Sequence, residues 1–447
     1  MISALSRRVA GRYGVLIGAA AALVVAAALL LAFASNDGPP KVTLITPPPS
    51  LTPELPGGSP AWAELAAGTP LEDPGLYVVD IETGTSWRLE PAVRPEARVV
   101  ANFLGWTPDG AAIAEIAVQL DNDGKADLWQ LYEAQPGSPF ELYLPRASAF
   151  RPSRFLWSPD ERFLVVSESY VDSSEETFWV YDLPADQETF RLPGRTDAWS
   201  SDSRFLSYHQ AGLGVLDTAT GKMAASSVEG TWSRRGARLA YIASYRGWSD
   251  RPGPSELRIR DFATGSDVLA TTVDDPPMQA PSWSADDQSI ALTVVNEQGG
   301  TTTLIIDADG GEAKAKVHGS VSAGWSSRDD ALLLSGNICA GIDIFTVRSD
   351  GTTLRNLTES DDAEMAPSWS PDGRKAAFIR YGQGTSALTM VATPDGEARE
   401  IAESGLGSLG ALGWSPDGRY FVVTLGEGFG FCEGEEPQIT SVEVLAP

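Results

Sequence analysis

The sequence predicts an all-β protein folded as a single β-propeller of eight four-stranded blades. Three observations carry this prediction: a tryptophan motif recurs eight times, a short apolar run follows the copies, and Asp- and Gly-rich turns separate further apolar runs. The copies start 33 to 51 residues apart, a period typical of propeller blades. They begin at Trp106, Trp157, Trp199, Trp232, Trp283, Trp325, Trp369 and Trp414.

In each motif the tryptophan is followed by serine or threonine and then by a tight turn, here called the Trp turn. In the copy at Trp369, Pro371 has the fixed φ that suits a type I turn, and Gly373 supplies the positive φ of a bulged hairpin. The copies at Trp414 and Trp106 keep this pattern. Looser copies, which lack the proline, the glycine or the aspartate, begin at Trp157, Trp199 and Trp232. The repeated tryptophans themselves are expected to be core residues.

Each copy also predicts three further strands. After the Trp turn come apolar, β-rich runs such as residues 162–166 and 289–295, which are typical of strands buried on both faces. A second hairpin then follows in most copies, as in residues 304–310 and 345–351, where an apolar strand ends in an Asp- and Gly-rich turn. Each unit is therefore a four-stranded meander.

The two ends of the repeat region predict how the ring closes. Residues 76–84 look like a third strand and its turn, yet they precede the first motif. Residues 439–445 look like the matching third strand of the last repeat, with no fourth strand after them. We therefore expect the ends to meet in one composite blade, which removes an open sheet edge. Eight motifs favour eight blades, and seven is the alternative if one copy is degenerate.

The repeat resembles that of a known family. Residues 366–374, Ala-Pro-Ser-Trp-Ser-Pro-Asp-Gly-Arg, preceded by residues 357–362, Leu-Thr-Glu-Ser-Asp-Asp, are similar to the repeat of TolB-type, WD-repeat-like propellers. The resemblance covers residues 71–447. It implies the propeller fold, and by analogy a protein-binding scaffold of the cell envelope. Because related propellers also form half of prolyl-oligopeptidase-type proteases, the fold alone identifies no chemistry.

The N-terminal region predicts attachment to a membrane. Residues 14–34 form an uncharged apolar stretch long enough to span a bilayer, and the arginines of residues 1–13 predict a cytoplasmic N-terminus. The alternatives are a cleavable signal peptide, with a small-residue site at residues 32–34, and a twin-arginine signal at residues 6–8. Residues 35–70 are proline-rich and predict an extended extracytoplasmic linker, which leads to the propeller at residues 71–447.

The formal net charge of −27 indicates which partners are disfavoured. Such a surface repels nucleic acid and anionic lipid headgroups, and it attracts cations or basic protein partners. The alternative interpretation is that acidic residues simply keep the protein soluble and monomeric. We therefore expect no nucleic-acid partner, an envelope protein partner of basic character, and a monomer.

The only two cysteines are Cys339 and Cys432. Both fall between the second and third strands of their repeats, so both are expected on one face of the ring. A disulfide between them would require the long loop of residues 426–438 to reach across the ring. The alternative is two free, partly buried thiols.

The residues expected of an enzyme are sparse. The two histidines, His209 and His318, fall in different repeats without a cysteine or carboxylate cluster beside either. No Gly-x-Ser-x-Gly elbow occurs, and no hydrolase domain follows the propeller in this sequence. We therefore expect no enzymatic activity, although a pair of the 60 acidic residues could still serve as a hydrolase or lyase site.

One segment has the pattern of a calcium loop. Asp121, Asp123 and Asp127 surround a glycine turn and match positions of the calcium loop in integrin-type propeller repeats, which this segment resembles. Gln119 departs from that pattern, because an aspartate is expected there. The alternative is an ordinary Asp-Gly hairpin turn without a metal. No other cofactor is expected.

For partner binding, the variable loops between second and third strands are the expected surface. The longest are residues 244–253 and 426–433, and their arginine and aromatic side chains have the composition of an interface hot spot. The candidate contact residues are Tyr245, Arg246, Trp248, Arg251, Phe429 and Phe431. The sequence thus favours a membrane-anchored, extracytoplasmic scaffold for protein partners. The alternative is a sensor that binds a small molecule or a glycan.

Overall fold

A computed structural model describes most of the chain from residue 60 onward. The described residues are 60–90, 98–119, 128–144, 150–170, 176–185, 187–210, 212–225, 229–244, 254–336, 343–360, 362–382, 384–394, 396–405, 407–426 and 441–445. Within these ranges no helix has the length and apolar character needed to cross a membrane. The expected membrane span at residues 14–34 lies outside them, so the anchor stays a prediction.

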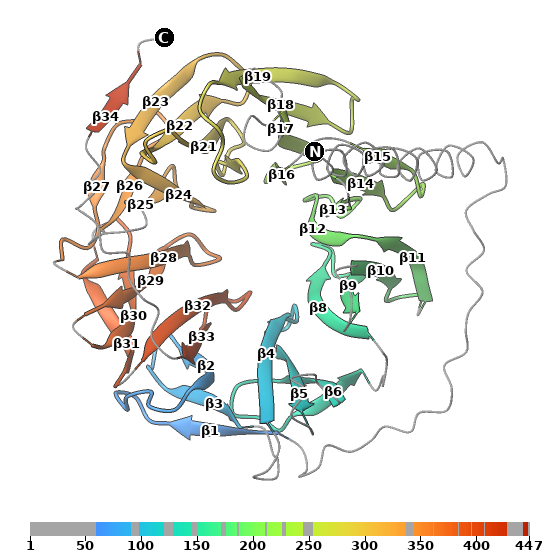
Figure 1. Ribbon diagram of the computed structural model, residues 1–447, viewed down its shortest axis with the longest axis vertical. Coiled ribbons are helices and arrows are strands. Elements are labelled where there is room, and N and C mark those ends of the chain that lie inside the picture. Colours follow the sequence, from blue (N-terminus) through green and yellow to red (C-terminus); the bar gives the residue numbers. More distant parts are fainter. Residues whose placement is uncertain are drawn as a thin grey trace, which may run out of the picture. The chain divides into compact units, whose positions relative to one another are not determined.

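Eight antiparallel sheets are arranged around a ring, which confirms the all-β propeller with eight blades (Figure 1). The first strand of each blade lies nearest the centre. Blade 1 comprises β4 (Arg98–Trp106), β5 (Ala112–Gln119), β6 (Leu128–Ala134) and β7 (Glu141–Leu144). Blade 2 comprises β8 (Phe150–Trp157), β9 (Phe163–Tyr170), β10 (Glu176–Asp182) and β11 (Gln187–Pro193). Blade 3 comprises β12 (Arg195–Trp199), β13 (Phe205–His209), β14 (Leu213–Asp217) and β15 (Met223–Ala225).

The next four blades follow the same meander. Blade 4 comprises β16 (Glu229–Trp232), β17 (Arg238–Ser244), β18 (Ser255–Asp261) and β19 (Asp267–Val273). Blade 5 comprises β20 (Ser282–Trp283), β21 (Ser289–Val295), β22 (Thr301–Asp307) and β23 (Ala313–His318). Blade 6 comprises β24 (Ser320–Trp325), β25 (Leu332–Gly336), β26 (Ile344–Val347) and β27 (Arg355–Asn356). Blade 7 comprises β28 (Ala363–Trp369), β29 (Lys375–Tyr381), β30 (Ser386–Ala392) and β31 (Ala398–Ser404).

Blade 8 is built from both ends of the repeat region, as the sequence predicts. Its inner strands are β32 (Ser408–Trp414) and β33 (Tyr420–Gly426), and its outer strands are β2 (Gly75–Asp80), β3 (Ser86–Glu90) and β1 (Ala61–Leu65). The strand β2 pairs antiparallel with β33, so the third strand of the last repeat comes from the start of the propeller. This pairing closes the ring without an open edge between the first and last repeats.

The predicted role of residues 439–445 is wrong. The strand β34 (Ser441–Val444) is not part of blade 8, because β2 already occupies the third position there. It pairs antiparallel with β23 and extends blade 5 to five strands. An isolated four-residue strand satisfies its backbone wherever an edge is free, and the outer edge of blade 5 is such a place.

The propeller also begins earlier than the predicted boundary at residue 71. The strand β1 pairs with β3 along its whole length, from Ala61 opposite Glu90 to Leu65 opposite Ser86. The backbone N–H of Leu71 then donates a 2.7 Å hydrogen bond to the carbonyl of Glu403 in blade 7. Residues 60–70, expected in the linker, are therefore part of the folded ring.

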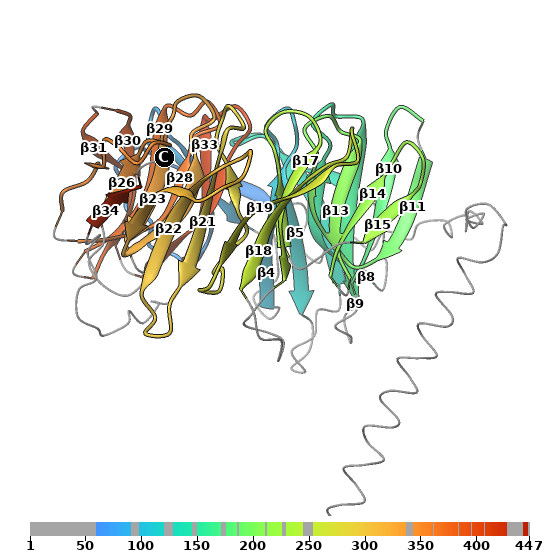
Figure 2. The ribbon, with the colours of Figure 1, turned by 90° about the horizontal axis from the view of Figure 1, so that it is seen from above.

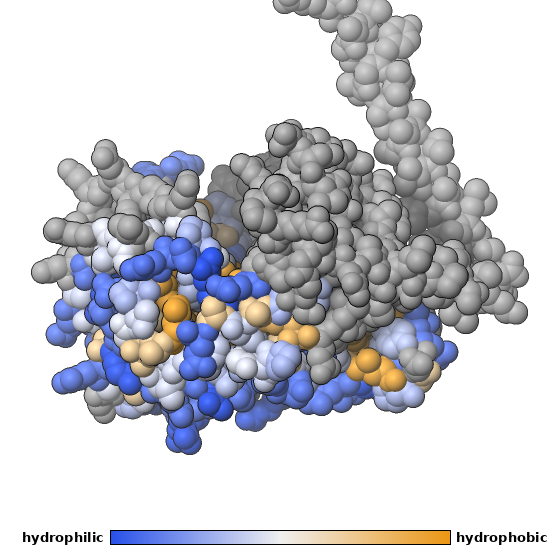
Figure 3. All heavy atoms as spheres, turned by 90° about the horizontal axis from the view of Figure 1, so that it is seen from below, coloured by the Kyte–Doolittle hydropathy of each residue, from blue (hydrophilic) through white to orange (hydrophobic). Residues whose placement is uncertain are grey.

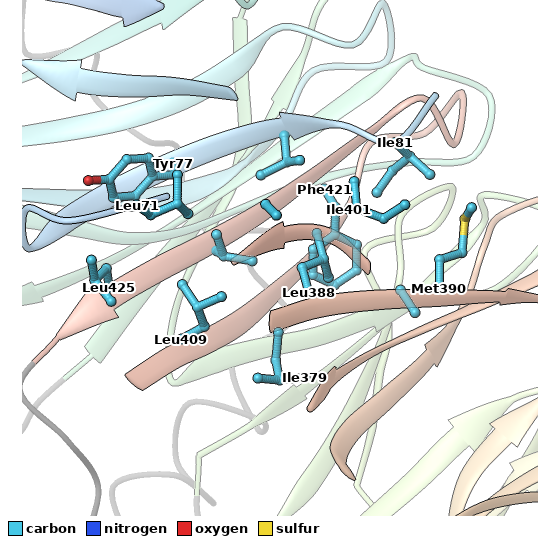
Figure 4. Packing of buried hydrophobic residues seen from close by; sticks show 14 residues of the cluster. Leu71, Tyr77, Ile81, Ile379, Leu388, Met390, Ile401, Leu409, Phe421 and Leu425 are labelled. Carbon is cyan, nitrogen blue, oxygen red and sulfur yellow. The ribbon is translucent and has the colours of Figure 1, made fainter. Parts of the chain in front are cut away.

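The core consists of apolar side chains between neighbouring blades. The largest cluster lies between blades 7 and 8, where side chains from β2, β29, β30, β32 and β33 face one another (Figure 4). Phe421 is 1% exposed, and Ile379 and Leu388 are fully buried. This packing joins the composite blade to its neighbour, so ring closure rests on apolar contacts as well as on strand pairing.

The repeated tryptophans are core residues, as expected. Trp199, Trp232, Trp283 and Trp325 are buried, and the other four are partly buried against the inter-blade clusters. Hydrophilic residues dominate the described part of the ring's side that Figure 3 shows, with apolar residues in separate small groups. Such scattered exposure is ordinary for a soluble surface.

Candidate functional site

The eight Trp turns gather on one face of the ring, because each joins the first and second strands of a meander. Figure 2 shows the ring edge-on, with the strands running between its two faces. The turns between third and fourth strands lie on this same face, whereas the loops between second and third strands lie on the opposite one. The set of eight Trp turns is called the turn rim below.

A chain of hydrogen bonds links the tryptophans from blade to blade. The indole N–H of each donor tryptophan points to the residue that precedes the tryptophan of the previous blade. The bonds are Trp199 to Leu156 O (3.5 Å), Trp232 to Ala198 O (3.2 Å), Trp283 to Thr231 O (2.9 Å), Trp325 to Ser282 O (3.2 Å), Trp369 to Gly324 O (3.1 Å) and Trp414 to Ser368 Oγ (3.1 Å). The indole nitrogens of Trp106 and Trp157 are buried without an acceptor among the described residues. The chain is thus interrupted on both sides of blade 1.

Within most Trp turns, a hydroxyl and a carboxylate close the turn. In blade 7 the Ser370 hydroxyl donates to Asp372 Oδ1 at 2.6 Å and accepts the Lys375 N–H at 3.0 Å. The same pair recurs as Thr107 with Asp109, Ser158 with Asp160, Ser200 with Asp202, Ser284 with Asp286 and Ser415 with Asp417. These bonds hold the turns in one conformation, which makes the turn rim a rigid surface.

Neighbouring turns of the rim also lock onto one another. The Ser203 hydroxyl in blade 3 accepts the N–H of Asp160 in blade 2 at 2.9 Å. The Ser326 hydroxyl in blade 6 donates to the carbonyl of Gly373 in blade 7 at 3.0 Å. In blade 5, Asp287 accepts the N–H groups of Arg234 and Arg235 in blade 4, at 2.7 and 2.9 Å. Each contact fixes one turn against the next.

The Trp turn of blade 4 differs from the other seven in its charge. It carries Arg234, Arg235 and Arg238 and contains no acidic residue. The Asp287 side chain is 4% exposed, and its carboxylate lies 4.0 Å from Arg238 Nη2. The same carboxylate accepts the backbone N–H groups of Arg234 and Arg235. Arg238 also lies over the Trp283 ring, 4.9 Å from its centroid.

The Arg234 side chain of blade 4 reaches past blade 5 to contact blade 6. Its Nη2 donates a 3.1 Å hydrogen bond to the carbonyl of Trp325, which belongs to blade 6 rather than to the adjacent blade 5. The intervening turn has Ala285 at the corresponding position, and this small side chain leaves room for the arginine. Solvent reaches Arg234, while the surrounding protein lowers the pKa of its guanidinium and the charge of Asp287 opposes that shift. The group stays protonated at neutral pH, because the ordinary arginine pKa is far above 7.

Arginine and aspartate pairs stiffen the same face in other blades. Arg162 donates to Asp182 at 2.7 Å, and Arg204 donates to Asp217 at 2.8 and 3.2 Å. The hydrogen bond from each arginine is the main reason why the pKa of its aspartate is lowered. These arginines also lie over Phe163 and Phe205. Each of these two arginines thus pairs with a carboxylate at 2.7 to 2.8 Å, whereas Arg234 of blade 4 bonds to a backbone carbonyl.

A buried ion pair lies near the opposite face, at the junction of blades 6 and 7. Glu364 is fully buried and accepts hydrogen bonds from Arg380 at 3.1 Å and from the Ser360 hydroxyl at 2.8 Å. Its second oxygen, Oε2, has no hydrogen-bond partner among the described residues. Burial raises the pKa of Glu364, and the Thr358 and Ser360 hydroxyls and the Arg380 charge counteract this. Asp343 joins the junction by accepting the Thr358 hydroxyl and the Ser360 N–H.

The site residues that the sequence predicts lie outside the described residues. This applies to the loop residues Tyr245, Arg246, Trp248, Arg251, Phe429 and Phe431, to Asp121, Asp123 and Asp127, and to Cys339 and Cys432. Their assignment to partner contact, calcium and a disulfide stays a prediction. Among the residues that are described, no group of three or more His, Cys, Asp or Glu side chains could hold a metal ion.

Both histidines are described and lie in separate blades. His209 ends β13 of blade 3, and His318 ends β23 of blade 5. The Nδ1 atom of His318 lies 3.2 Å from the Thr302 hydroxyl, and its Nε2 atom lies 3.9 Å from Glu443 in β34. His318 lies opposite Ser441 in the pairing of β23 with the C-terminal strand β34.

Sequence reasoning missed Arg234, Asp287 and the Glu364 junction as notable positions. The sequence does indicate Arg234 as unusual, because three arginines within residues 234–238 replace the usual turn residues in a strongly acidic chain. Its reach to Trp325 depends on the ring geometry, which the local sequence does not contain.

Comparison with known proteins gives short matches to propeller repeats. No family model matches the chain. It is 38% identical over 80 residues to the Tol-Pal system protein TolB of Alcanivorax borkumensis, which covers 17% of this chain and 18% of that protein. It is 30% identical over 127 residues to the Protein TolB homolog of Chlorobium luteolum, with coverage of 25% and 29%. It is 39% identical over 89 residues to the Uncharacterized peptidase YuxL of Bacillus subtilis, with coverage of 19% and 13%.

Solved structures similar to this chain have low sequence identity to it. Dipeptidyl peptidase 4 of Porphyromonas gingivalis is similar with a TM-score of 0.50 and 10% identity, over 73% of this chain and 56% of that one. TolB of Acinetobacter baumannii is similar with a TM-score of 0.33 and 14% identity, over 76% and 82%. The matched stretches span less than a third of the length of each of these three curated relatives.

Proposed function

We propose that this chain, a β-propeller similar to TolB proteins, acts as a binding scaffold for protein partners at the cell envelope. Its relatives include both TolB proteins and a peptidase propeller, so similarity alone does not choose between a binding role and a part in an enzyme. The binding role is supported by the arginines in the Trp turn of blade 4.

The observation that carries the proposal is a set of arginines fixed on a rigid surface. The Trp turn of blade 4 is locked to blade 5 through Asp287 and to blade 6 through the bond from Arg234 to Trp325. Among the described residues, no carboxylate lies within ion-pairing distance of the Arg234 or Arg235 side chain. Arginine is enriched in interface hot spots, and side chains fixed before binding lose less entropy on association.

The proposed location follows from the N-terminal sequence. Residues 14–34 would hold the protein in a membrane with residues 1–13 in the cytoplasm, and the propeller would lie on the other side. Resistance of the membrane-bound chain to alkaline carbonate extraction, with protease access to the propeller only from outside the cytoplasm, is the expected result. Release by carbonate, or a mature chain that starts after residue 34, would overturn the anchor.

The scaffold role is tested by affinity capture with the tagged full-length chain. The chain is solubilised in mild detergent after cross-linking in intact envelopes, and captured proteins are identified by mass spectrometry. Two variants are compared with the native chain: Arg234→Gln with Arg235→Gln on the turn rim, and Arg246→Ala with Trp248→Ala in the predicted loop. We expect a protein that the native chain captures reproducibly and that one of the two variants loses.

The capture experiment also shows which face of the ring binds the partner. Loss with the arginine pair on the rim places the partner on the Trp-turn face, whereas loss with the loop pair places it on the opposite face. Capture of the same proteins by all three baits would exclude both surfaces as the contact site, and capture of no protein by any bait would contradict the scaffold role. In that case the second candidate, a sensor for a small molecule or a glycan, would be preferred.

A further inference from the structure

We propose that Arg234 and Arg235 in the Trp turn of blade 4 bind a carboxylate on a peptide segment of the partner. This proposal rests on the scaffold role proposed above and adds the chemistry of what is recognised. It starts from a substitution in the repeat. The third residue after the tryptophan is an aspartate in six of the eight turns, namely Asp109, Asp160, Asp202, Asp286, Asp372 and Asp417. In blade 4 it is Arg235, and in blade 6 it is Arg328, which lies 3.8 Å from the carboxylate of Asp329.

The arginine side chains are not needed to close their own turn. In blade 4 the Ser233 hydroxyl donates to the carbonyl of Arg235 at 2.9 Å, where six of the other turns use the aspartate carboxylate. The carboxylate of Asp287 replaces the missing acid by accepting the N–H groups of Arg234 and Arg235 from the next blade. The backbone is therefore satisfied, and both guanidinium groups remain for other contacts.

The two guanidinium groups have donors to spare. Each has five N–H donors, and the hydrogen bond to Trp325 uses one of those of Arg234. That bond also holds Arg234 in place, which reduces the ordering cost of binding a ligand. Arg235 is exposed beside it, and its backbone is fixed by Asp287. A planar guanidinium matches the two oxygens of a carboxylate or of a phosphate.

The charge of the whole protein selects between these anions. With a net charge of −27, the field around the propeller disfavours polyanions such as nucleic acid. The exposed acids Asp202 in blade 3 and Asp286 in blade 5 flank the blade 4 turn along the rim. A segment with one acidic residue between basic residues satisfies both the arginines and these neighbours. The partner segment is therefore expected to carry an aspartate or glutamate flanked by lysine or arginine.

The test uses the full-length chain in detergent, immobilised on beads, and two pools of synthetic nonapeptides. One pool has glutamate and the other has glutamine at the central position, and all other positions are randomised. We expect the native chain to retain the glutamate pool at least about tenfold over the glutamine pool, because hydrogen bonds to a charged group are strong. Sequencing of the retained peptides should show lysine and arginine beside the central glutamate.

The variants show whether the arginines are responsible. Arg235→Gln should reduce the preference for glutamate several-fold, and Arg234→Gln with Arg235→Gln should abolish it. The matched control is Arg204→Gln in blade 3, an arginine of the same face that is paired with Asp217, and it should keep the preference. Because the Arg235 side chain forms no hydrogen bond or ion pair with another described residue, its single variant tests the proposal even if the double variant folds poorly.

Three outcomes would overturn the proposal. They are equal retention of both pools by the native chain, an undiminished glutamate preference in Arg235→Gln, or loss of the preference in Arg204→Gln alone. Displacement of bound peptides by millimolar phosphate without any preference for the glutamate pool would likewise reject a peptide carboxylate as the ligand. If these outcomes occur while the capture experiment still finds a partner, the scaffold role stands and only the carboxylate site falls.

Discussion

The indole N–H of Trp369 donates a 3.1 Å hydrogen bond to the carbonyl of Gly324, the residue that precedes the tryptophan of the neighbouring blade. Six tryptophans make the equivalent bond to the preceding blade, and it crosses from one blade to the next without using any strand pairing. Trp157 has the same place in its own repeat but its indole nitrogen has no acceptor. Comparison of Trp369 with Trp157 therefore distinguishes the contribution of the hydrogen bond from that of the packing of the indole ring.

We predict that Trp369→Phe destabilises the protein by about 1–2 kcal/mol more than Trp157→Phe does. Both tryptophans are partly buried, so both variants lose similar apolar contact. Only the first also leaves a carbonyl without its donor, whereas the second removes a donor that was already unsatisfied. Urea unfolding of the two variants measures the difference. Equal losses would show that the inter-blade bond contributes nothing to stability.

The glycine of the Trp turn predicts a second difference between blades. In blade 7, a Cβ added at Gly373 would lie 2.5 Å from Ser326 Oγ, 2.8 Å from Ser327 Oγ and 2.9 Å from Arg328 N. In blade 1, a Cβ at Gly110 would meet nothing within 4 Å. Both glycines have positive φ, 68° and 86°. We expect Gly110→Ala to cost about 1 kcal/mol for the backbone conformation alone, and Gly373→Ala to cost about 2–4 kcal/mol because a clash is added.

Thermal unfolding of the two glycine variants checks this prediction. The clash would also break the hydrogen bonds from Ser326 and Ser327 to the blade 7 turn, at 3.0 and 2.7 Å. Similar unfolding midpoints for Gly373→Ala and Gly110→Ala would mean that neighbouring turns are not locked together as described.

The glycine position also shows how far the sequence predicts the fold. Where glycine is absent, Glu161, Ser203 and Asp287 adopt the same left-handed conformation, with φ of 59°, 60° and 62°. The looser motifs still form the turn because the hydroxyl and carboxylate of the same motif close it locally. Eight blades and their closure through residues 76–84 were therefore predictable, since each depends on a local pattern repeated along the chain.

Placements that depend on distant pairing were not predictable. Residues 439–445 have the alternation of any exposed strand, and nothing in them specifies β23 as the neighbour. The reach of Arg234 to Trp325 likewise depends on Ala285 in the blade between them. The arginines of the blade 4 turn were therefore recognisable in the sequence as a cluster of positive charge. Their contacts depend on how the blades are arranged in the ring, which the sequence alone does not show.

The buried Glu364 predicts a dependence of stability on pH. Burial raises its pKa above the ordinary 4.5, so the folded protein takes up this proton more readily than the unfolded chain. The stability contributed by this group is full below the ordinary pKa and declines as the pH rises through the folded pKa. We expect Glu364→Gln to lack that decline, so that the native chain loses stability relative to the variant as the pH rises above the ordinary glutamate pKa of 4.5.

Unfolding midpoints of the native chain and Glu364→Gln across this pH range measure the effect. The control is Glu359→Gln, a change at an exposed residue of the same segment, which should follow the native curve. A constant difference between the native chain and Glu364→Gln at all pH values would show that Glu364 keeps one protonation state throughout.

The pair of Arg162 and Asp182 predicts the opposite dependence at low pH. The hydrogen bond from Arg162 is the main cause that lowers the pKa of Asp182 below the ordinary 3.8. The stability from this group is therefore full above the ordinary pKa and is lost as the pH falls through the folded pKa. We expect Asp182→Asn to be less stable than the native chain at neutral pH, and the gap to close as the pH falls below the ordinary aspartate pKa of 3.8.

Acid unfolding curves of the native chain and Asp182→Asn test this expectation. Asp309→Asn is the matched control, because Asp309 is an exposed residue in the corresponding turn of blade 5 and forms no ion pair within the described part of the chain. Its difference from the native chain should be small and should not change with pH. If the gap for Asp182→Asn also stays constant down to the lowest pH, Arg162 does not stabilise the ionised carboxylate, and the pairs of this face contribute packing rather than charge.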